Sequence, residues 1–188
     1  TLLNRLSIDT KVALITNTHL TCKELIAQIL EEFEVDYQPG SKQKLLSQLN
    51  DYLIRQLGNN TNMVLLIDEA QNLPTKVLEE VRMLSNLETE KEKLIQIILV
   101  GQPQLKAKLE HAKLEQFKQR IAVFYHLDAL NQKETKDYIH YRLKLVSPEA
   151  ENIFSPEAIS QIYAHSKGIP RVINILCDSA LLSGYVLN

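Results

Sequence analysis

Apolar runs of strand length alternate with segments of helical periodicity as far as about residue 127. Short runs rich in β-branched residues predict strands at residues 11–17, 63–67, 94–101 and 121–127. Between them, apolar residues spaced three and four apart predict helices after Thr21, at 42–57 and at 75–87, and then a basic helical stretch to Arg120. Strands separated by helices in this order predict an α/β fold whose parallel sheet is covered on both faces.

The pattern changes after residue 130, where only helix signals follow. Asn131-Gln-Lys-Glu134 is a capping box that predicts a helix to about residue 146. Ser155-Pro156 starts a second helix that ends near Gly168, and Pro170 starts a third. We therefore expect two domains, an α/β core at 1–130 and a small α-helical domain at 131–188.

Composition narrows the classes of protein. The chain has 188 residues, is 45% hydrophobic and 23% charged, and carries a formal net charge of -2. Such a balance indicates a globular protein with no overall attraction to nucleic acid or anionic lipid. No apolar run is long enough to span a bilayer. The two cysteines and five histidines lie in no metal-ligand spacing, which favours a reduced, cytoplasmic compartment and argues against a histidine-based metalloenzyme.

The most informative stretch is "VLLIDEAQNL", residues 64–73, in which a buried strand runs directly into Asp68 and Glu69. Functional groups of α/β sheets gather at the carboxyl ends of the strands. There, an aspartate can hold Mg²⁺ while the following glutamate polarises the water that attacks a nucleotide γ-phosphate. The alternative is an ordinary acid pair that caps the next helix.

Two amide side chains follow neighbouring strands. Gln102 comes after the strand at 94–101, where an amide can orient a water beside the γ-phosphate, or can simply be a turn residue before Pro103. Asn17, at the end of the first strand, can hold Glu69 inactive by a hydrogen bond, or merely close a turn.

Two arginines are further candidates. Arg120 ends the basic helical stretch and can reach the phosphate of a neighbouring subunit, although a surface helix charge is the simpler interpretation. Arg171 lies at a helix start after Gly168-Ile-Pro170, where it can aim a guanidinium across a cleft or pair with Asp178.

Four segments together resemble the AAA+ ATPases of the general secretion pathway protein A type, whose relatives act in pilus biogenesis and exopolysaccharide export. They are "VLLIDEAQNL", "EEVRMLSNLETEKEKLIQIILVGQPQL", "FKQRIAVFYHL" and "GIPRVINILCDSALL". The resemblance implies a P-loop NTPase sheet core with a helical lid. It also implies these roles: Walker B for Asp68 and Glu69, sensor 1 for Gln102, arginine finger for Arg120, sensor 2 for Arg171, and the glutamate-switching residue for Asn17.

The resemblance further implies ATP and Mg²⁺ bound between core and lid, and hydrolysis that depends on self-association into a ring or other oligomer. We expect a cytoplasmic domain at the inner membrane that energises or assembles an envelope machine for type II secretion, pilus formation or exopolysaccharide export. Its partners would be inner-membrane secretion or export components, and nucleic acid is not an expected partner.

The chain departs from the family at its beginning. Members carry a Gly-x-x-x-x-Gly-Lys-Thr loop followed by an apolar helix, and residues 1–7 resemble the continuation of that helix. Thr1 would then be the hydroxyl residue of the loop or the residue after it. The phosphate-binding lysine is expected upstream of Thr1, and without it the chain is expected to bind ATP poorly and to be inactive.

Two other classes of function stay open on the sequence. The stretch 104–120, with five basic and two acidic residues, allows a nucleotide-gated DNA-binding regulator of the transposition-ATPase type. A scaffold that does not hydrolyse nucleotide is the third class. Salt-dependent DNA binding would indicate the regulator, and ATP turnover would exclude the scaffold.

Overall fold

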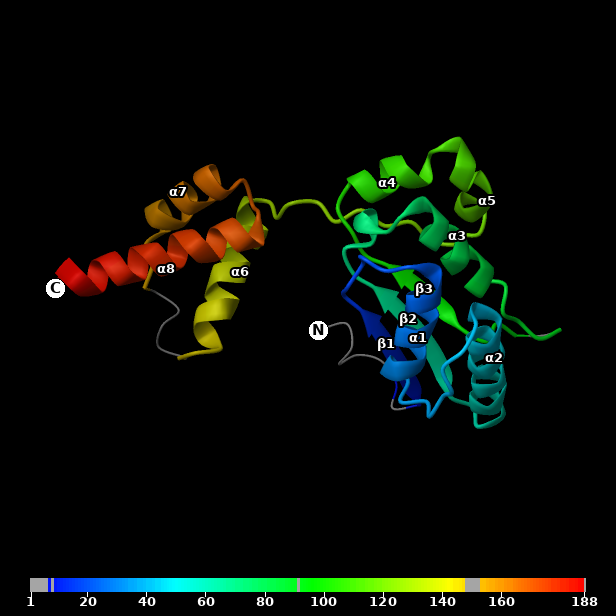
Figure 1. Cartoon of the computed structure of the whole chain (residues 1–188). Coiled ribbons are helices and arrows are strands. Elements are labelled where there is room, and N and C mark those ends of the chain that lie inside the picture. The colour runs from blue at the N-terminus through cyan, green and yellow to red at the C-terminus, as the bar shows by residue number, and fades with distance from the viewer. Residues whose placement is uncertain (1–6, 8, 91, 148–152, 188) are drawn as a thin grey trace. The chain divides into compact units, whose positions relative to one another are not determined.

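The computed structural model describes residues 7, 9–90, 92–147 and 153–187. The chain divides into two compact units, Thr1–Val123 and Phe124–Asn188 (Figure 1). Residues 1–6, on which the expected helix continuation and the role of Thr1 depend, lie outside the described residues.

The first unit is built on three parallel strands in the order β1-β2-β3: β1 (Thr10–Ile15), β2 (Asn62–Ile67) and β3 (Gln96–Leu99). The register pairs Ile15 with Ile67 and Ile67 with Leu99, so all three strands end at the same edge of the sheet. This arrangement confirms the predicted parallel sheet. It also places the residues that follow Ile67 and Leu99 side by side.

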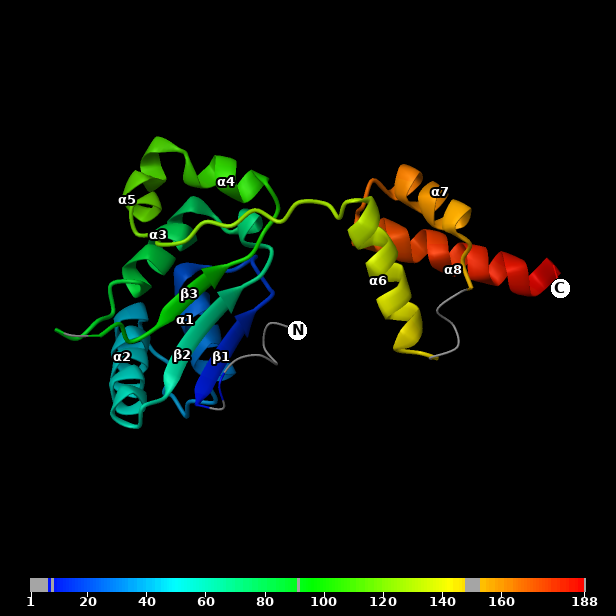
Figure 2. The same cartoon turned by 180° about the vertical axis from the view of Figure 1, so that it is seen from behind.

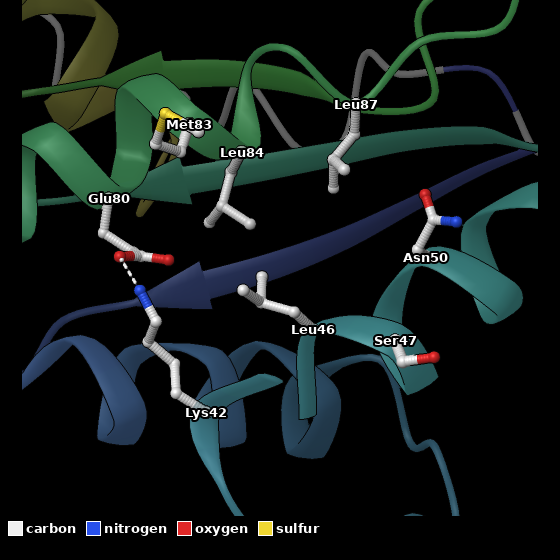
Figure 3. A pocket seen from close by; sticks show the side chains of 8 residues that line it. All are labelled: Lys42, Leu46, Ser47, Asn50, Glu80, Met83, Leu84 and Leu87. Atoms are coloured by element: carbon white, nitrogen blue, oxygen red, sulfur yellow. Dashed lines mark hydrogen bonds and ion pairs between the residues drawn. The ribbon is translucent and has the colours of Figure 1, made fainter. Parts of the chain in front are cut away.

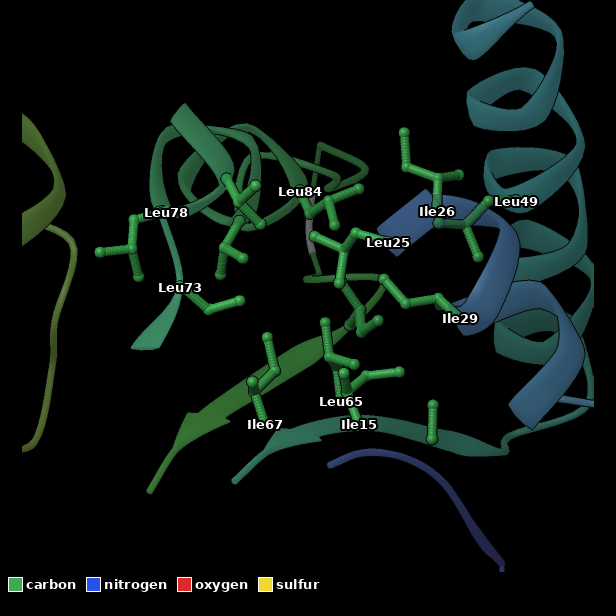
Figure 4. Close-up of a cluster of buried hydrophobic side chains, with 14 of the residues drawn as sticks. Ile15, Leu25, Ile26, Ile29, Leu49, Leu65, Ile67, Leu73, Leu78 and Leu84 are labelled. Atoms are coloured by element: carbon green, nitrogen blue, oxygen red, sulfur yellow. The ribbon is translucent and has the colours of Figure 1, made fainter. Parts of the chain in front are cut away.

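Three helices pack on one face of the sheet: α1 (Cys22–Glu32), α2 (Lys42–Gly58) and α3 (Thr75–Leu84). Their buried apolar side chains meet alternate strand residues such as Ile15, Leu65 and Ile67 (Figure 4). No described helix of the first unit lies over the second face of the strands (Figure 2), so the predicted helical cover of that face does not come from this unit. Parallel crossovers are nearly always right-handed, so connections that step the same way along a sheet leave their helices on the same face.

Two elements are shorter than expected because the chain turns between them. α3 ends at Leu84 instead of residue 87, and β3 begins at Gln96 instead of residue 94. The Leu94 N–H donates to the Leu87 carbonyl, and Glu88 and Lys93 form an antiparallel bridge. The intervening residues thus form their own backbone pairing, which periodicity does not reveal.

The strand predicted at 121–127 is wrong. After α4 (Gln104–Leu109), η3 (Ala112–Leu114) and α5 (Glu115–Lys118), residues 121–131 contain no regular structure. Val123, Tyr125 and Leu127 are more than 80% exposed. A strand requires a neighbour for its backbone N–H and carbonyl groups, and within the described residues β3 pairs only with β2. Strand propensity alone therefore does not produce a strand here.

The second unit contains three helices: α6 (Gln132–Lys144), α7 (Pro156–Ser166) and α8 (Pro170–Leu187). They confirm the predicted helical C-terminal region, and a capping box starts the first of them, as Asn131 and Glu134 bond each other's backbone N–H. The helices bury a small core of Ile139, Ile159, Ile162 and Ile173. Within the described residues, none of the helices of either unit has the length and apolarity needed to cross a membrane.

Gly168 joins α7 to α8 in a conformation that requires glycine. Its φ is +75°, and its carbonyl accepts a hydrogen bond from the Leu130 N–H at 2.9 Å. A Cβ on Gly168 would lie only 1.8 Å from the Leu130 carbonyl oxygen. This close approach sets the start of α8, and with it the backbone of Arg171.

Candidate functional site

The two acids lie where β2 ends. The Asp68 N–H donates to the Ile15 carbonyl at 2.9 Å, which extends the pairing of β2 with β1 by one residue. Glu69 then takes a left-handed conformation, with φ 50° and ψ 33°, and turns the chain into η2 (Ala70–Asn72). Left-handed backbone costs a residue with a Cβ about 1–2 kcal/mol and is concentrated at functional sites.

The Glu69 carboxylate is held by two amide side chains. Its Oε2 accepts a hydrogen bond from Gln71 Nε2 at 2.6 Å and a longer one from Gln102 Nε2 at 3.4 Å. The Gln102 backbone N–H in turn donates to Gln71 Oε1 at 3.0 Å. Glu69, Gln71 and Gln102 thus form one closed hydrogen-bonded group. The sequence placed Glu69 and Gln102 near each other, and the structure brings them into direct contact.

Gln71 is the residue that sequence reasoning missed. It lies within the "DEAQ" stretch, two positions after Glu69 on a single turn of helix, and is half-buried. The available signal was this short spacing from the acid. Its second partner, the Gln102 backbone, is unpredictable without the register of β2 and β3.

Further hydrogen bonds fix the backbone of η2. The Ala70 N–H donates to the Val100 carbonyl at 2.9 Å. Lys108, on α4, donates from its Nζ to the carbonyls of Gln71 at 2.8 Å and Leu73 at 2.6 Å. The loop after β2 is thereby fastened to the residues that follow β3.

Asp68 can provide one of the ligands of a magnesium ion. It is half-buried, its Oδ1 accepts from the Glu69 N–H at 2.8 Å, and its Oδ2 has no hydrogen-bond donor among the described residues. No group of three or more His, Cys, Asp or Glu side chains in the described ranges is arranged to hold a metal. Mg²⁺ needs only one or two protein carboxylates when phosphates and waters complete its shell, so Asp68 fits that mode of binding.

Asn17 makes a local contact. Its Oδ1 accepts a hydrogen bond from the His19 N–H at 3.1 Å, which closes a turn after β1. Within the described residues Asn17 makes no hydrogen bond to Glu69, whose partners are Gln71 and Gln102. Its role as a switch of Glu69 remains a prediction.

The two arginines lie apart from this group in the chain and belong to different units. Arg120 follows α5 in the first unit, and Arg171 is the second residue of α8 in the second. Both side chains are exposed, and neither forms an ion pair within the part of the chain that the structure describes. The alternative role of Arg171, an ion pair with Asp178, is therefore not formed.

A pocket of about 360 Å³ lies elsewhere, between α2 and α3 (Figure 3). Apolar side chains, including Leu46 and Leu84, line most of it, and Lys42 Nζ bonds Glu80 Oε2 across it at 2.7 Å. This hydrogen bond, donated by the ammonium to the Glu80 carboxylate, stabilises the charged form of Lys42 and raises its pKa. The pocket contains none of the predicted site residues, so we do not assign nucleotide to it.

Comparison with known proteins gives a family, a related protein and several solved structures. A family model described as "AAA domain" matches residues 1–109. General secretion pathway protein A of Aeromonas hydrophila is 40% identical over 185 residues, which is 98% of this chain and 34% of that protein. The chain thus spans about a third of that relative's length.

Solved structures show the same fold at low identity. The Aeropyrum pernix ORC2 protein in its ADP form aligns with a TM-score of 0.66 and 18% identity, over 93% of this chain and 49% of that one. CDC6P from Pyrobaculum aerophilum aligns with a TM-score of 0.57 and 18% identity, over 73% of this chain and 36% of that one. Similarity at this level of identity concerns the fold alone.

Proposed function

The chain belongs to the AAA domain family. From this membership we propose that it binds ATP with Mg²⁺ and hydrolyses ATP, releasing the γ-phosphate, at the carboxyl edge of its sheet. The observation that carries the proposal is the Glu69 carboxylate, held by Gln71 and Gln102 beside Asp68. An acid fixed at the end of a central parallel strand is well placed to take a proton from an attacking water.

The proposed division of roles follows the geometry. Asp68 contributes its free oxygen to Mg²⁺, which would neutralise charge on the phosphates. Glu69 accepts the proton of the attacking water. Gln102 holds Glu69 through its side chain and orients the water. We further propose that a loop upstream of Thr1 contacts the phosphates. The nucleotide would be bound between a core at residues 1–130 and a lid at residues 131–188.

Assembly completes the proposed mechanism. Arg120 is exposed beyond α5, so it is available to a neighbouring copy, and we assign it to the phosphates of that copy's site. Arg171, at the start of α8, would contact the phosphates from the lid. Hydrolysis then depends on a ring or other oligomer.

The cellular role is proposed from the secretion relative. Similarity to general secretion pathway protein A supports an ATPase that energises or assembles an envelope machine at the cytoplasmic face of the inner membrane. A DNA-binding regulator is the alternative, resting on the basic stretch 104–120. One of its five cations, Lys108, is occupied by the carbonyls of η2, which weakens that alternative.

The direct test replaces Glu69 in a protein that includes the upstream phosphate loop. Glu69→Gln is expected to bind ATP normally while turnover falls roughly 10²- to 10⁴-fold, the range for loss of a general base. Asp68→Ala is expected to weaken Mg²⁺-dependent ATP binding as well. Glu110→Gln, which removes a charge from the exposed end of α4, is the matched control and should behave as wild type. Near-normal turnover in Glu69→Gln would remove Glu69 from the mechanism.

A further inference from the structure

We propose that Gln71 is a positioning residue for hydrolysis. Its side-chain amide donates to one carboxylate oxygen of Glu69 and accepts from the backbone N–H of Gln102, and so connects Glu69 to the backbone after β3. The inference rests on the proposed ATPase function and assigns a role within the same site. It is motivated by the bond from Gln71 Nε2 to Glu69 Oε2, which at 2.6 Å is much shorter than the 3.4 Å bond from Gln102.

Both ends of the Gln71 amide are used, and the two partners determine its orientation. The Gln102 backbone N–H can only donate, so the oxygen of the Gln71 amide must face it, at 3.0 Å. The NH₂ group then faces the carboxylate of Glu69, which can only accept when ionised. The amide therefore cannot be flipped without losing both hydrogen bonds.

The two amide donors leave one oxygen of the general base open. Both Gln71 and Gln102 donate to Oε2 of Glu69. Among the described residues, Oε1 of Glu69 has no donor. This second oxygen is available to accept the proton of a water, whereas an exposed glutamate without such restraint would divide its time among several rotamers.

The surroundings of Gln71 preserve this arrangement. The Lys108 ammonium holds the Gln71 carbonyl at 2.8 Å, which fixes the backbone from which the side chain extends. Gly101 provides the space: a Cβ there would lie 2.6 Å from Gln71 Oε1 and 3.2 Å from a methyl carbon of Leu105. Gly101→Ala is therefore expected to displace the Gln71 amide without touching Glu69 directly.

The test measures kcat, KM and melting temperature in a protein that includes the phosphate loop, with ATP as substrate. Gln71→Ala is expected to lower kcat about 10- to 100-fold, as for a modestly misplaced catalytic group, with KM and melting temperature little changed. Gln71→Glu should lower kcat at least as much, because a carboxylate cannot donate to Glu69 and repels it. Gly101→Ala should resemble Gln71→Ala. Asn72→Ala, on the exposed neighbour in η2, is the control and should match wild type.

A double-mutant comparison separates positioning from a general structural effect. If Gln71 acts through Glu69, Gln71→Ala should change turnover little further in a Glu69→Gln background. Unchanged or increased kcat in Gln71→Ala, or independent effects of the two substitutions, overturns the positioning role. When wild type is active and Glu69→Gln is not, such a result leaves the ATPase proposal standing. A wild-type protein without turnover overturns both.

Discussion

The acids at the end of β2 and the two arginines illustrate different ways of placing a polar group. Glu69 has hydrogen bonds to residues that follow two adjacent strands, all within one unit. Arg120 and Arg171 are exposed, and the described residues provide no anionic partner for either. A sheet edge can assemble the first kind of group in a single chain. The exposed arginines acquire a role only if a nucleotide or another copy of the chain supplies their partner. Three substitutions test this difference between the acids and the arginines.

The largest expected effect is at Arg120. If Arg120 acts on a neighbouring copy, Arg120→Ala should bind ATP normally but hydrolyse it about 10³-fold or more slowly, as for other arginine fingers. Mixing Arg120→Ala with Glu69→Gln should restore part of the activity, because some interfaces would then pair an intact Glu69 with an intact Arg120. Wild-type specific activity should also rise with protein concentration.

Lys118→Ala is the matched control for this experiment, because it removes a charge from the end of α5, the short helix that Arg120 follows. It should leave turnover unchanged. If wild-type specific activity is independent of protein concentration and the mixture of Arg120→Ala with Glu69→Gln stays inactive, Arg120 is a surface charge without a role on a neighbouring copy.

The next effect concerns the backbone that carries Arg171. Gly168→Ala places a Cβ against the Leu130 carbonyl at a positive φ, and we expect it to destabilise the second unit by about 2–4 kcal/mol. Denaturant unfolding measures the change. Gly184→Ala, in the same unit at a position where a Cβ meets nothing within 4 Å, is the control and should not destabilise it. Equal stability of the two variants would show that the Gly168 turn relaxes easily.

The smallest effect is expected at Arg171. If its guanidinium contacts phosphate, Arg171→Ala should weaken nucleotide binding about 10-fold, the weight of a charge-assisted hydrogen bond of roughly 1.5 kcal/mol. Without nucleotide its melting temperature should match wild type, and the increase in melting temperature on adding ATP should be smaller. Arg142→Ala, on the exposed last turn of α6, should show the full increase. The same increase in Arg171→Ala would argue against a role in binding.

The parts of the fold that local sequence determines were predicted well. The helix predicted after Thr21 and the capping box predicted at Asn131 both form, and each helix begins with a capping box whose atoms all lie within four residues. β2 was also recognisable, since its continuous apolar run Met63–Ile67 is typical of a buried strand in a parallel sheet.

The errors concern partners that are distant in sequence. Residues 121–127 resemble β2 in composition, yet they form no strand, because pairing is not encoded in the segment itself. At the site, the sequence indicated the acids and Gln102 but not Gln71. The amide of Gln71 becomes informative only when the register of β2 and β3 brings the Gln102 backbone next to it.

The exposed segment Val123–Leu127 has a consequence for solution behaviour. The segment contains aromatic and β-branched residues and no proline or glycine. Segments of this composition pair with copies of themselves and aggregate. Aggregation of this kind removes protein from solution as concentration rises. A functional oligomer has the opposite signature, because each added copy completes another site. Light scattering recorded beside turnover therefore separates the two, and a charged residue at Tyr125, 81% exposed, should suppress only the scattering.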